Sequence, residues 1–163
     1  MRDRTPHRTP HRTPHPTTTL LATVAALAAL LLALAPPAAA KTAAGFQGAV
    51  RSQTNEVRSD RDLPRLGKQA CVQRFAARQA RRMAKKERIY HQDLGKVLES
   101  CSLSLAGENV AYGYSSASAV MDAWMDSPGH RANIVKKRYR LLGVGARKSE
   151  SGTWYLAQVF GRK

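Results

Sequence analysis

The chain has 163 residues, of which 43% are hydrophobic, and its formal net charge is +16 at pH 7. This length supports one domain with a core of its own, and we expect no second domain. The strongly basic balance favours partners that carry negative charge.

The first forty residues have the features of an export signal. Several arginines precede an apolar stretch over residues 20–35, and three alanines at 38–40 form a small-residue cleavage site. The stretch is shorter than the ~20 residues that a membrane-spanning helix needs, and Pro36 follows it directly. We therefore expect residues 1–40 to be a signal peptide cleaved after Ala40, no transmembrane segment after processing, and a secreted, extracellular protein.

The segment that follows is predicted to lack a packed structure at first. Residues 41–48 are small and polar, so we expect a flexible lead-in over residues 41–54 and a domain over residues 55–163. A short exposed helix is predicted from residue 49 to residue 60, because this stretch carries few apolar residues and ends before Pro64.

The clearest helix signal covers residues 68–86. Apolar and small side chains recur there on two neighbouring stripes with a period of 3.6 residues, and arginine and lysine cover the rest. We predict a helix that buries one face and presents a very basic face to water. A shorter helix is predicted over residues 94–104, which leaves His91 in the connecting loop or at a helix end.

Two short runs near the C-terminus, at residues 107–113 and 127–134, contain the candidate functional residues Glu108 and His130. GENVAYG, at residues 107–113, is predicted to form a tight irregular turn because it holds two glycines and an asparagine. Ser115 to Ser118 then offer caps for a helix over residues 119–124.

The second run, SPGHRANI, predicts another helix, with Ser127 as its N-cap and Pro128 at its first position. His130 then falls at the third residue, where the helix dipole disfavours the imidazolium form. We expect His130 to be neutral at pH 7 and available as a ligand or proton acceptor.

The last part of the chain alternates between apolar positions in two stretches, residues 142–146 and 154–160, with a turn at residues 150–152. This pattern predicts a C-terminal β-hairpin. The predicted fold class is therefore α+β, with several helices around a small antiparallel sheet.

Two cysteines, Cys71 and Cys101, lie beyond the leader, and export to an oxidising compartment favours a disulfide between them. Closing such a loop contributes about 3–4 kcal/mol in the chain-entropy picture. A catalytic thiol is not supported, because neither cysteine has neighbours that would lower its pKa in a recognisable way.

The densest basic cluster, residues 78–88, is interleaved with alanines and lacks the aromatic residues on which single-stranded nucleic acids stack. We expect anionic cell-wall polymers, acidic polysaccharide or membrane head groups as partners, with binding that weakens as salt rises, and no specific nucleic acid. The protein is expected to be a monomer.

Only two histidines lie outside the extreme N-terminus, and with one carboxylate they suggest a site. His91, Glu108 and His130 would supply two imidazoles and a carboxylate, a set able to hold a divalent metal or to share protons near neutrality. The structural alternative is that each imidazole only satisfies buried polar groups, and that Glu108 accepts backbone amides as a clamp.

Residues spread from Asn55 to Gly161 together resemble the CAP superfamily of secreted domains, also called SCP or pathogenesis-related-1-like, in its compact bacterial form. The matching residues are Asn55, Arg58, Leu66, His91, GENVAYG, Trp124, SPGHRANI, GVG at 143–145 and QVFG at 158–161. The resemblance implies an αβα sandwich and a cleft where His91, Glu108 and His130 meet. In some relatives a divalent cation such as zinc is bound there, and His91 and His130 would be its ligands.

One departure from the family pattern bears on mechanism. Many eukaryotic members have a second cleft carboxylate three residues after the tryptophan, and that position here is Ser127. Asp126 lies next to it and is the candidate replacement. Acid and base catalysis by paired carboxylates is therefore in doubt.

These features favour an extracellular binding or scaffold module with a cleft that holds a metal or serves the structure. The alternative is a zinc-dependent hydrolase of the peptidase type, in which Glu108 is the catalytic base. That interpretation makes Glu108 serve both as ligand and as base, two tasks that compete. Lipid or sterol binding, suggested by relatives, is a second alternative.

Overall fold

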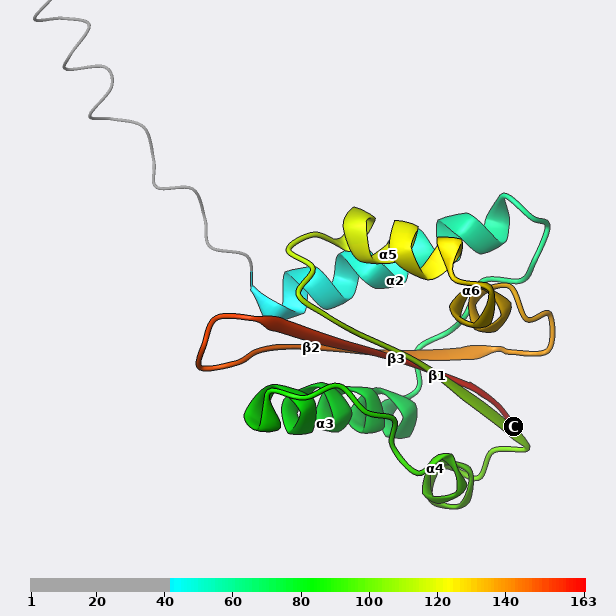
Figure 1. Ribbon diagram of the computed structural model, residues 1–163. Coiled ribbons are helices and arrows are strands. Elements are labelled where there is room, and N and C mark those ends of the chain that lie inside the picture. Colours follow the sequence, from blue (N-terminus) through cyan, green and yellow to red (C-terminus); the bar gives the residue numbers. More distant parts are fainter. Residues whose placement is uncertain (1–41) are drawn as a thin grey trace, which may run out of the picture. The chain divides into compact units, whose positions relative to one another are not determined.

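The computed structural model describes residues 42–163, and the predicted signal peptide with its cleavage site after Ala40 lies outside them. Figure 1 shows helices packed on both faces of a small sheet. In chain order the elements are α2 (Ala43–Ser59), α3 (Ala70–Lys86), α4 (Leu94–Cys101), β1 (Leu105–Tyr112), α5 (Ala117–Asp126), α6 (Pro128–Ile134), β2 (Leu141–Lys148) and β3 (Trp154–Arg162).

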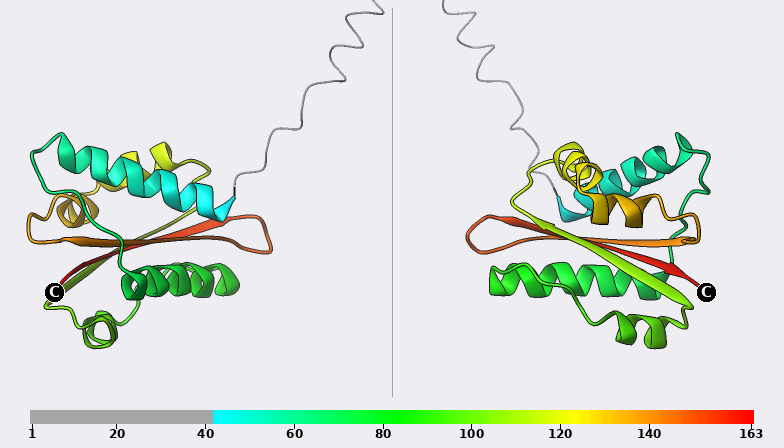
Figure 2. Two further views of the ribbon diagram at one scale, coloured as in Figure 1. Left: turned by 180° about the vertical axis from the view of Figure 1, so that it is seen from behind. Right: turned by 45° about the vertical axis from the view of Figure 1, so that its right-hand side comes forward.

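The sheet has three antiparallel strands in the order β1-β3-β2. Strands β2 and β3 form the predicted C-terminal hairpin, and β1 pairs with the other side of β3. Helices α2, α5 and α6 cover one face of the sheet, and α3 and α4 cover the other (Figure 2). The predicted α+β class and αβα sandwich are confirmed.

The two faces of β3 divide the core. Leu156 and Phe160 pack with α2, α5 and α6, whereas Ala157 and Val159 pack toward α3 and α4. Every residue from 155 to 161 is buried. Strand β3 is central, so both of its faces are apolar.

The predicted flexible lead-in over residues 41–54 is wrong where the structure describes it. Thr42 caps α2 by accepting a hydrogen bond from the Gly45 amide, and the helix begins at Ala43. Phe46 and Val50, one turn apart, are buried, and the Phe46 ring packs edge-on against Trp154 at 5.3 Å between centroids. Two well-spaced large residues thus suffice to dock a segment that is otherwise small and polar.

The predicted turn at GENVAYG is also wrong, because residues 105–112 form β1. Gly107 serves close packing rather than a turn: a Cβ atom there would lie 2.1 Å from the Tyr139 hydroxyl. Only Gly113, at the end of the run, has a positive φ, of 85°. The predicted helices over residues 68–86 and 94–104 are present as α3 and α4 with shorter ends.

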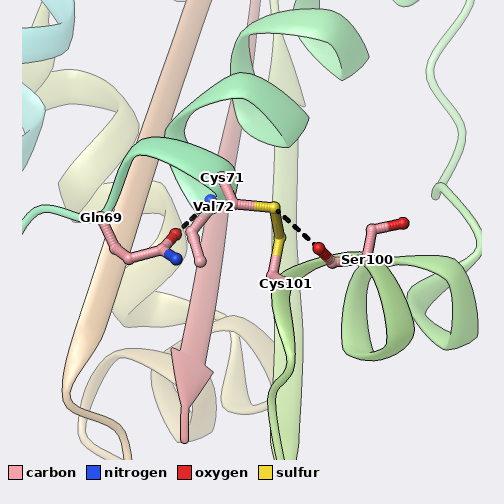
Figure 3. The surroundings of a disulfide bond; sticks show 5 residues. All are labelled: Gln69, Cys71, Val72, Ser100 and Cys101. Carbon is pink, nitrogen blue, oxygen red and sulfur yellow. Dashed lines mark hydrogen bonds between the residues drawn. A yellow bond between two sulfur atoms is a disulfide. The ribbon is translucent and has the colours of Figure 1, made fainter.

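The predicted disulfide is present and joins α3 to the end of α4. Figure 3 shows Cys71 bonded to Cys101, with the Ser100 carbonyl oxygen 3.5 Å from the Cys71 sulfur. In the same view, the Gln69 side chain caps α3 by accepting a hydrogen bond from the Val72 amide at 2.7 Å. The bridge closes a loop of 30 residues.

The GVG run on β2 lets α3 approach the sheet closely. A Cβ atom at Gly143 would lie 2.4 Å from the Val72 carbonyl oxygen, and one at Gly145 would lie 2.1 Å from the Ala76 carbonyl oxygen. Both contacts involve backbone, which cannot swing away. The outward orientation of the opposite, basic face of α3 follows from this packing.

We predict that Gly145→Ala lowers the free energy of unfolding by about 1–3 kcal/mol, because α3 must move to admit the methyl group. Gly48→Ala is the matched control: Gly48 lies within α2 and nothing lies within 4 Å of its added Cβ. The control is expected to stabilise the protein by about 0.5–1 kcal/mol through helix propensity. Urea unfolding of both variants measures the two effects, and equal effects would contradict the packing argument.

Candidate functional site

A cleft of about 310 Å³ lies beside β1, at the junction of α5 and α6. Its lining includes His130, Ser127, Trp124, Tyr112, Tyr114 and Ile89. Among the described residues, the two large hydrophobic side chains that remain exposed are Ile89 and Tyr112, at 40% and 54% exposure. Both belong to this cleft, which therefore combines an apolar wall with an imidazole.

Glu108 lies on β1 with a side chain that is only 1% exposed. Its Oε2 accepts hydrogen bonds from His91 Nδ1 at 2.8 Å and from the Gln92 amide at 3.1 Å. Its Oε1 accepts one from Gln92 Nε2 at 2.6 Å. Both oxygens are thus occupied, as a buried carboxylate requires. The side chain has the geometry of a clamp that holds residues 91 and 92 to β1.

His91 is held by this carboxylate but faces solvent, since its side chain is 61% exposed. A carboxylate partner requires Nδ1 to carry a hydrogen, so the neutral ring has its free lone pair on Nε2. Glu108 thereby fixes both the orientation and the tautomer of His91.

His130 is the third residue of α6, as predicted. Its Nδ1 lies 2.8 Å from Ser127 Oγ. Burial, and secondarily the charge of His91, lower the pKa of His130 below its usual value. The lowered pKa favours the neutral imidazole at pH 7, and its largest cause is desolvation of the ring. Ser127 occupies the N-cap position, but its hydroxyl contacts His130 and makes no capping bond.

The three side chains come to the same edge of the sheet from opposite faces. Glu108 pairs across the sheet with Val159, which packs under α3 and α4, whereas Asn109 pairs with Gln158 on the face of α6 and His130. Because successive side chains of a strand alternate in direction, Glu108 points away from α6. Within residues 42–163 no group of three or more His, Cys, Asp or Glu side chains is placed to hold a metal ion.

Sequence reasoning missed the residue that binds Glu108 most fully. Gln92 provides two of its three donors, and nothing but its position next to His91 could have indicated this role. Asn109 and Asn133 have a structural role: Asn109 Nδ2 donates to the His130 carbonyl at 3.1 Å, and Asn133 Nδ2 donates to the Glu108 carbonyl at 3.1 Å. These amides fix α6, and with it His130, against β1.

The sequence profile of the Cysteine-rich secretory protein family (CAP) matches residues 51–160 of the chain. The chain belongs to the CAP family. This match covers most of the described domain, including the cleft and every strand.

Known relatives agree with this assignment. The uncharacterized protein YkwD of Bacillus subtilis is 29% identical over 133 residues, covering 77% of this chain and 51% of that protein. An extracellular protein containing a SCP domain from Bacillus anthracis is 26% identical over 79% of this chain and 45% of that one, with a TM-score of 0.66. An outer surface protein from Borrelia burgdorferi, 20% identical, shares the fold with a TM-score of 0.65 over 70% of this chain and 90% of its own. The chain spans about half the length of the two Bacillus relatives.

The expected replacement for the missing second carboxylate does not join the Glu108 cluster. Asp126 ends α5, is exposed, and makes no hydrogen bond or ion pair within the described residues. Glu108 is therefore the one buried carboxylate among the described residues, and both of its oxygens accept hydrogen bonds.

We predict that Glu108→Gln lowers the free energy of unfolding by about 2–3 kcal/mol, because an amide in this position would direct a donor at the donors of His91 or Gln92. Asp126→Asn removes the same charge from an exposed, unbonded side chain and is expected to change stability by less than about 0.5 kcal/mol. Chemical denaturation compares them. Similar small losses in both would show that Glu108 is not a clamp.

Proposed function

We propose that this CAP domain is a secreted, extracellular binding module that docks on anionic cell-wall polymers through the outer face of α3. The observation that carries the proposal is the unneutralised positive charge of that face. We define the basic face of α3 as Arg74, Arg78, Arg81, Arg82 and Lys85, all of which are exposed.

The basic face is fixed by the core beneath it. Val72, Ala76, Ala80 and Met83, on the other side of α3, are fully buried. Since α3 is locked against β2 by Gly143 and Gly145, the cations cannot rotate inward. A rigid helix then presents a row of charge about 16 Å long, from the helical rise of 1.5 Å per residue.

No acidic side chain neutralises this row. The ion pair between His91 and Glu108 is the sole ion pair in residues 42–163, so no lysine or arginine there lies within 4.0 Å of a carboxylate. Acidic side chains are nevertheless near this row, since Asp93 and Glu99 share a hollow with Arg78 and Arg82. The excess of positive charge attracts polyanions and raises their local concentration, and salt screens this attraction. These properties support docking on an extended anionic surface.

Specific binding of nucleic acid is not favoured by the aromatic residues near this face. Phe75 is partly buried, and the Arg78 guanidinium lies over its ring, 4.9 Å from the ring centroid. The Lys86 amine and the Arg88 guanidinium lie 5.4 and 5.5 Å from the centroid of the Tyr90 ring. Rings covered in this way offer no open platform on which bases could stack.

Within residues 42–163, no helix has the length and apolar composition to cross a membrane.

The hydrolase alternative is less well supported, because Glu108 would have to release three hydrogen bonds before it could accept a proton from water. The lipid or sterol alternative has the cleft of Ile89, Tyr112, Tyr114 and Trp124 in its favour. Its volume of about 310 Å³ lies at the small end of the range usual for ligand pockets, about 300–1,000 Å³.

For zinc or another divalent cation, the contacts support a site with fewer protein ligands, and so weaker binding, than the set of His91, Glu108 and His130 suggested. Both oxygens of Glu108 accept hydrogen bonds. Within the described part of the chain, only Nδ1 of His91 and of His130 is hydrogen-bonded, which leaves Nε2 of each ring available. We propose that a divalent cation is held by these two imidazoles alone, beside the cleft that His130 lines. Glu108 would orient His91 through its bond to Nδ1, an arrangement known to increase ligand basicity. Two protein ligands are fewer than the three of ordinary catalytic zinc sites.

We predict that zinc binds the purified protein with a dissociation constant weaker than about 1 μM, and that His130→Ala weakens this binding at least roughly tenfold by removing one of two ligands. Calorimetric titration measures both. Asp126→Asn, next to the cleft but outside the proposed ligand pair, is the control and is expected to bind zinc as the parent does. Unchanged binding in His130→Ala would eliminate this cleft as the metal site.

Docking through α3 is tested with two triple variants of equal charge. We predict that Arg74→Gln, Arg81→Gln and Lys85→Gln together weaken sedimentation with purified cell wall roughly tenfold at low salt, because they remove charge from one face. The control, Arg61→Gln, Lys137→Gln and Arg138→Gln, removes the same charge from exposed positions elsewhere.

The control is expected to retain binding within about twofold, and binding of the parent is expected to fall steadily as salt rises. Equal losses in both triple variants would show that net charge alone, and not the face of α3, governs docking. Binding that ignores salt would contradict the proposal altogether. Vesicles of anionic lipid, run in parallel, distinguish head groups from wall polymers.

A further inference from the structure

A second positively charged feature lies away from α3's basic face, in a cavity of about 460 Å³ between α2 and the segment that leads into α3. Its polar lining consists of Arg51, Arg65 and Lys68 with Gln47, Ser52, Asn55 and Gln73. No aspartate or glutamate lines it. Three cations thus share one concave site that contains no opposing charge.

Arg51 is held in this cavity by the edge of the sheet. One of its terminal nitrogens donates to the Leu142 carbonyl on β2, and the other donates to Gln73 Oε1 at 2.7 Å. Gln73 is fixed in turn, because its Nε2 donates to the Val144 carbonyl at 2.8 Å and its Oε1 accepts from the Val144 amide at 3.1 Å. The guanidinium is partly buried, and this burial lowers the pKa of Arg51. A fixed, partly desolvated cation is pre-organised for an anion.

The other two cations are free to turn toward a ligand. Arg65 and Lys68 are exposed, and in the described chain neither pairs with a carboxylate. The only hydrogen bond of Arg65 there is a long one, 3.4 Å, to Ser59 Oγ, and Lys68 makes none. Their backbone is nevertheless held: Asn55 accepts from the Leu66 amide at 2.7 Å and donates to the Leu66 carbonyl at 3.2 Å.

Among the neutral groups of the lining, Gln47 offers a donor, whereas Ser52 gives its hydrogen to Glu56 and presents only its oxygen to the cavity. Gln47 Oε1 is engaged by Gln73 Nε2 at 3.4 Å, which leaves the Gln47 amide nitrogen without a partner among the described residues. Ser52 Oγ donates to Glu56 Oε1 at 2.8 Å, so the nearby carboxylate is turned to that hydroxyl and does not line the cavity.

We propose that this cavity binds a tetrahedral dianion, the phosphate group of free phosphate or of a phosphomonoester. Three cations exceed the charge of a carboxylate or a phosphodiester, and the planar fork of arginine suits the oxygens of phosphate. This site uses residues other than the basic face of α3. The cavity would bind one discrete phosphate group, whereas the basic face of α3 would bind an extended polymer.

The test uses inorganic phosphate as the probe, titrated into the purified protein by calorimetry at low salt and neutral pH. Arg65→Gln with Lys68→Gln is expected to weaken phosphate binding roughly tenfold or more, because charge-assisted hydrogen bonds are lost from exposed side chains that the fold does not need. The matched control, Arg61→Gln with Lys137→Gln, removes the same charge outside the cavity and is expected to bind within about twofold of the parent. Thermal unfolding confirms that both variants fold.

Competing probes establish the ligand class. Acetate and dimethyl phosphate, which carry one charge, are expected to bind at least about tenfold more weakly than phosphate. Glycerol phosphate separates the sources: tighter binding than phosphate assigns the site to the end of a larger molecule, and equal binding assigns it to the free ion. Either result supports the proposal.

The proposal is overturned if phosphate fails to bind at millimolar concentration, if acetate binds as well, or if the control pair weakens binding as much as the cavity pair. The α3 triple variant keeps this test separate from docking on cell wall, because it is expected to bind phosphate within about twofold of the parent. Loss of phosphate binding in that variant, with retention in the cavity pair, would place the anion on α3 and overturn the cavity site while leaving the docking function intact.

Discussion

A sheet of three strands has two edges, and closing those edges is the constraint from which both sites of this domain arise. Unpaired strand edges invite association with other chains. At the β1 edge, Trp124 Nε1 donates to the Val110 carbonyl at 3.3 Å, and Asn133 donates to the Glu108 carbonyl at 3.1 Å. At the β2 edge, Arg51 and Gln73 bind the carbonyls of Leu142 and Val144. The side chains that close the first edge carry the cleft, and those that close the second form the floor of the proposed phosphate site.

Burial of a carboxylate at the first edge sets the chemistry available there. A charge removed from water must be compensated by hydrogen bonds, and Glu108 receives three. This commitment gives Glu108 a structural role, because its hydrogen bonds hold residues 91 and 92 to β1. Catalysis by Glu108 would weaken the same bonds that place His91, so the two roles oppose each other. A binding function has no such conflict, because it can use the exposed side of His91 while Glu108 stays in place.

Much of this arrangement could be predicted from the sequence, and the failures share a cause. Periodic apolar residues predicted α3 and the C-terminal hairpin, because this signal is local in the sequence. The disulfide was predicted because the chain has only two cysteines, which can pair in only one way. GENVAYG was misjudged because glycine permits both a turn and a close contact, and only the tertiary structure reveals that Gly107 faces Tyr139. The start of α2 was misjudged because Phe46 docks on Trp154, more than a hundred residues away. The convergence of His91 with Glu108 came from family resemblance, whereas the part of Gln92 could not be inferred from any pattern.

Buried and exposed arginines of this domain alike have no carboxylate partner within residues 42–163. Arg58 is fully buried, yet its guanidinium faces no carboxylate: it donates to the carbonyls of Pro64, Ile134, Lys136 and Tyr139. Two of these carbonyls lie at or just beyond the end of α6, where the helix dipole is negative. Arg51 likewise binds a strand carbonyl. These two arginines thus bind backbone and amide oxygens and no acidic side chain. Within residues 42–163, the surface lysines and arginines form no ion pair with a carboxylate either. Such a surface repels itself. An anion that binds the folded chain and not the unfolded chain stabilises the fold by RT ln(1 + c/Kd), where c is the free anion concentration. Binding of the anions proposed above would therefore be linked to folding.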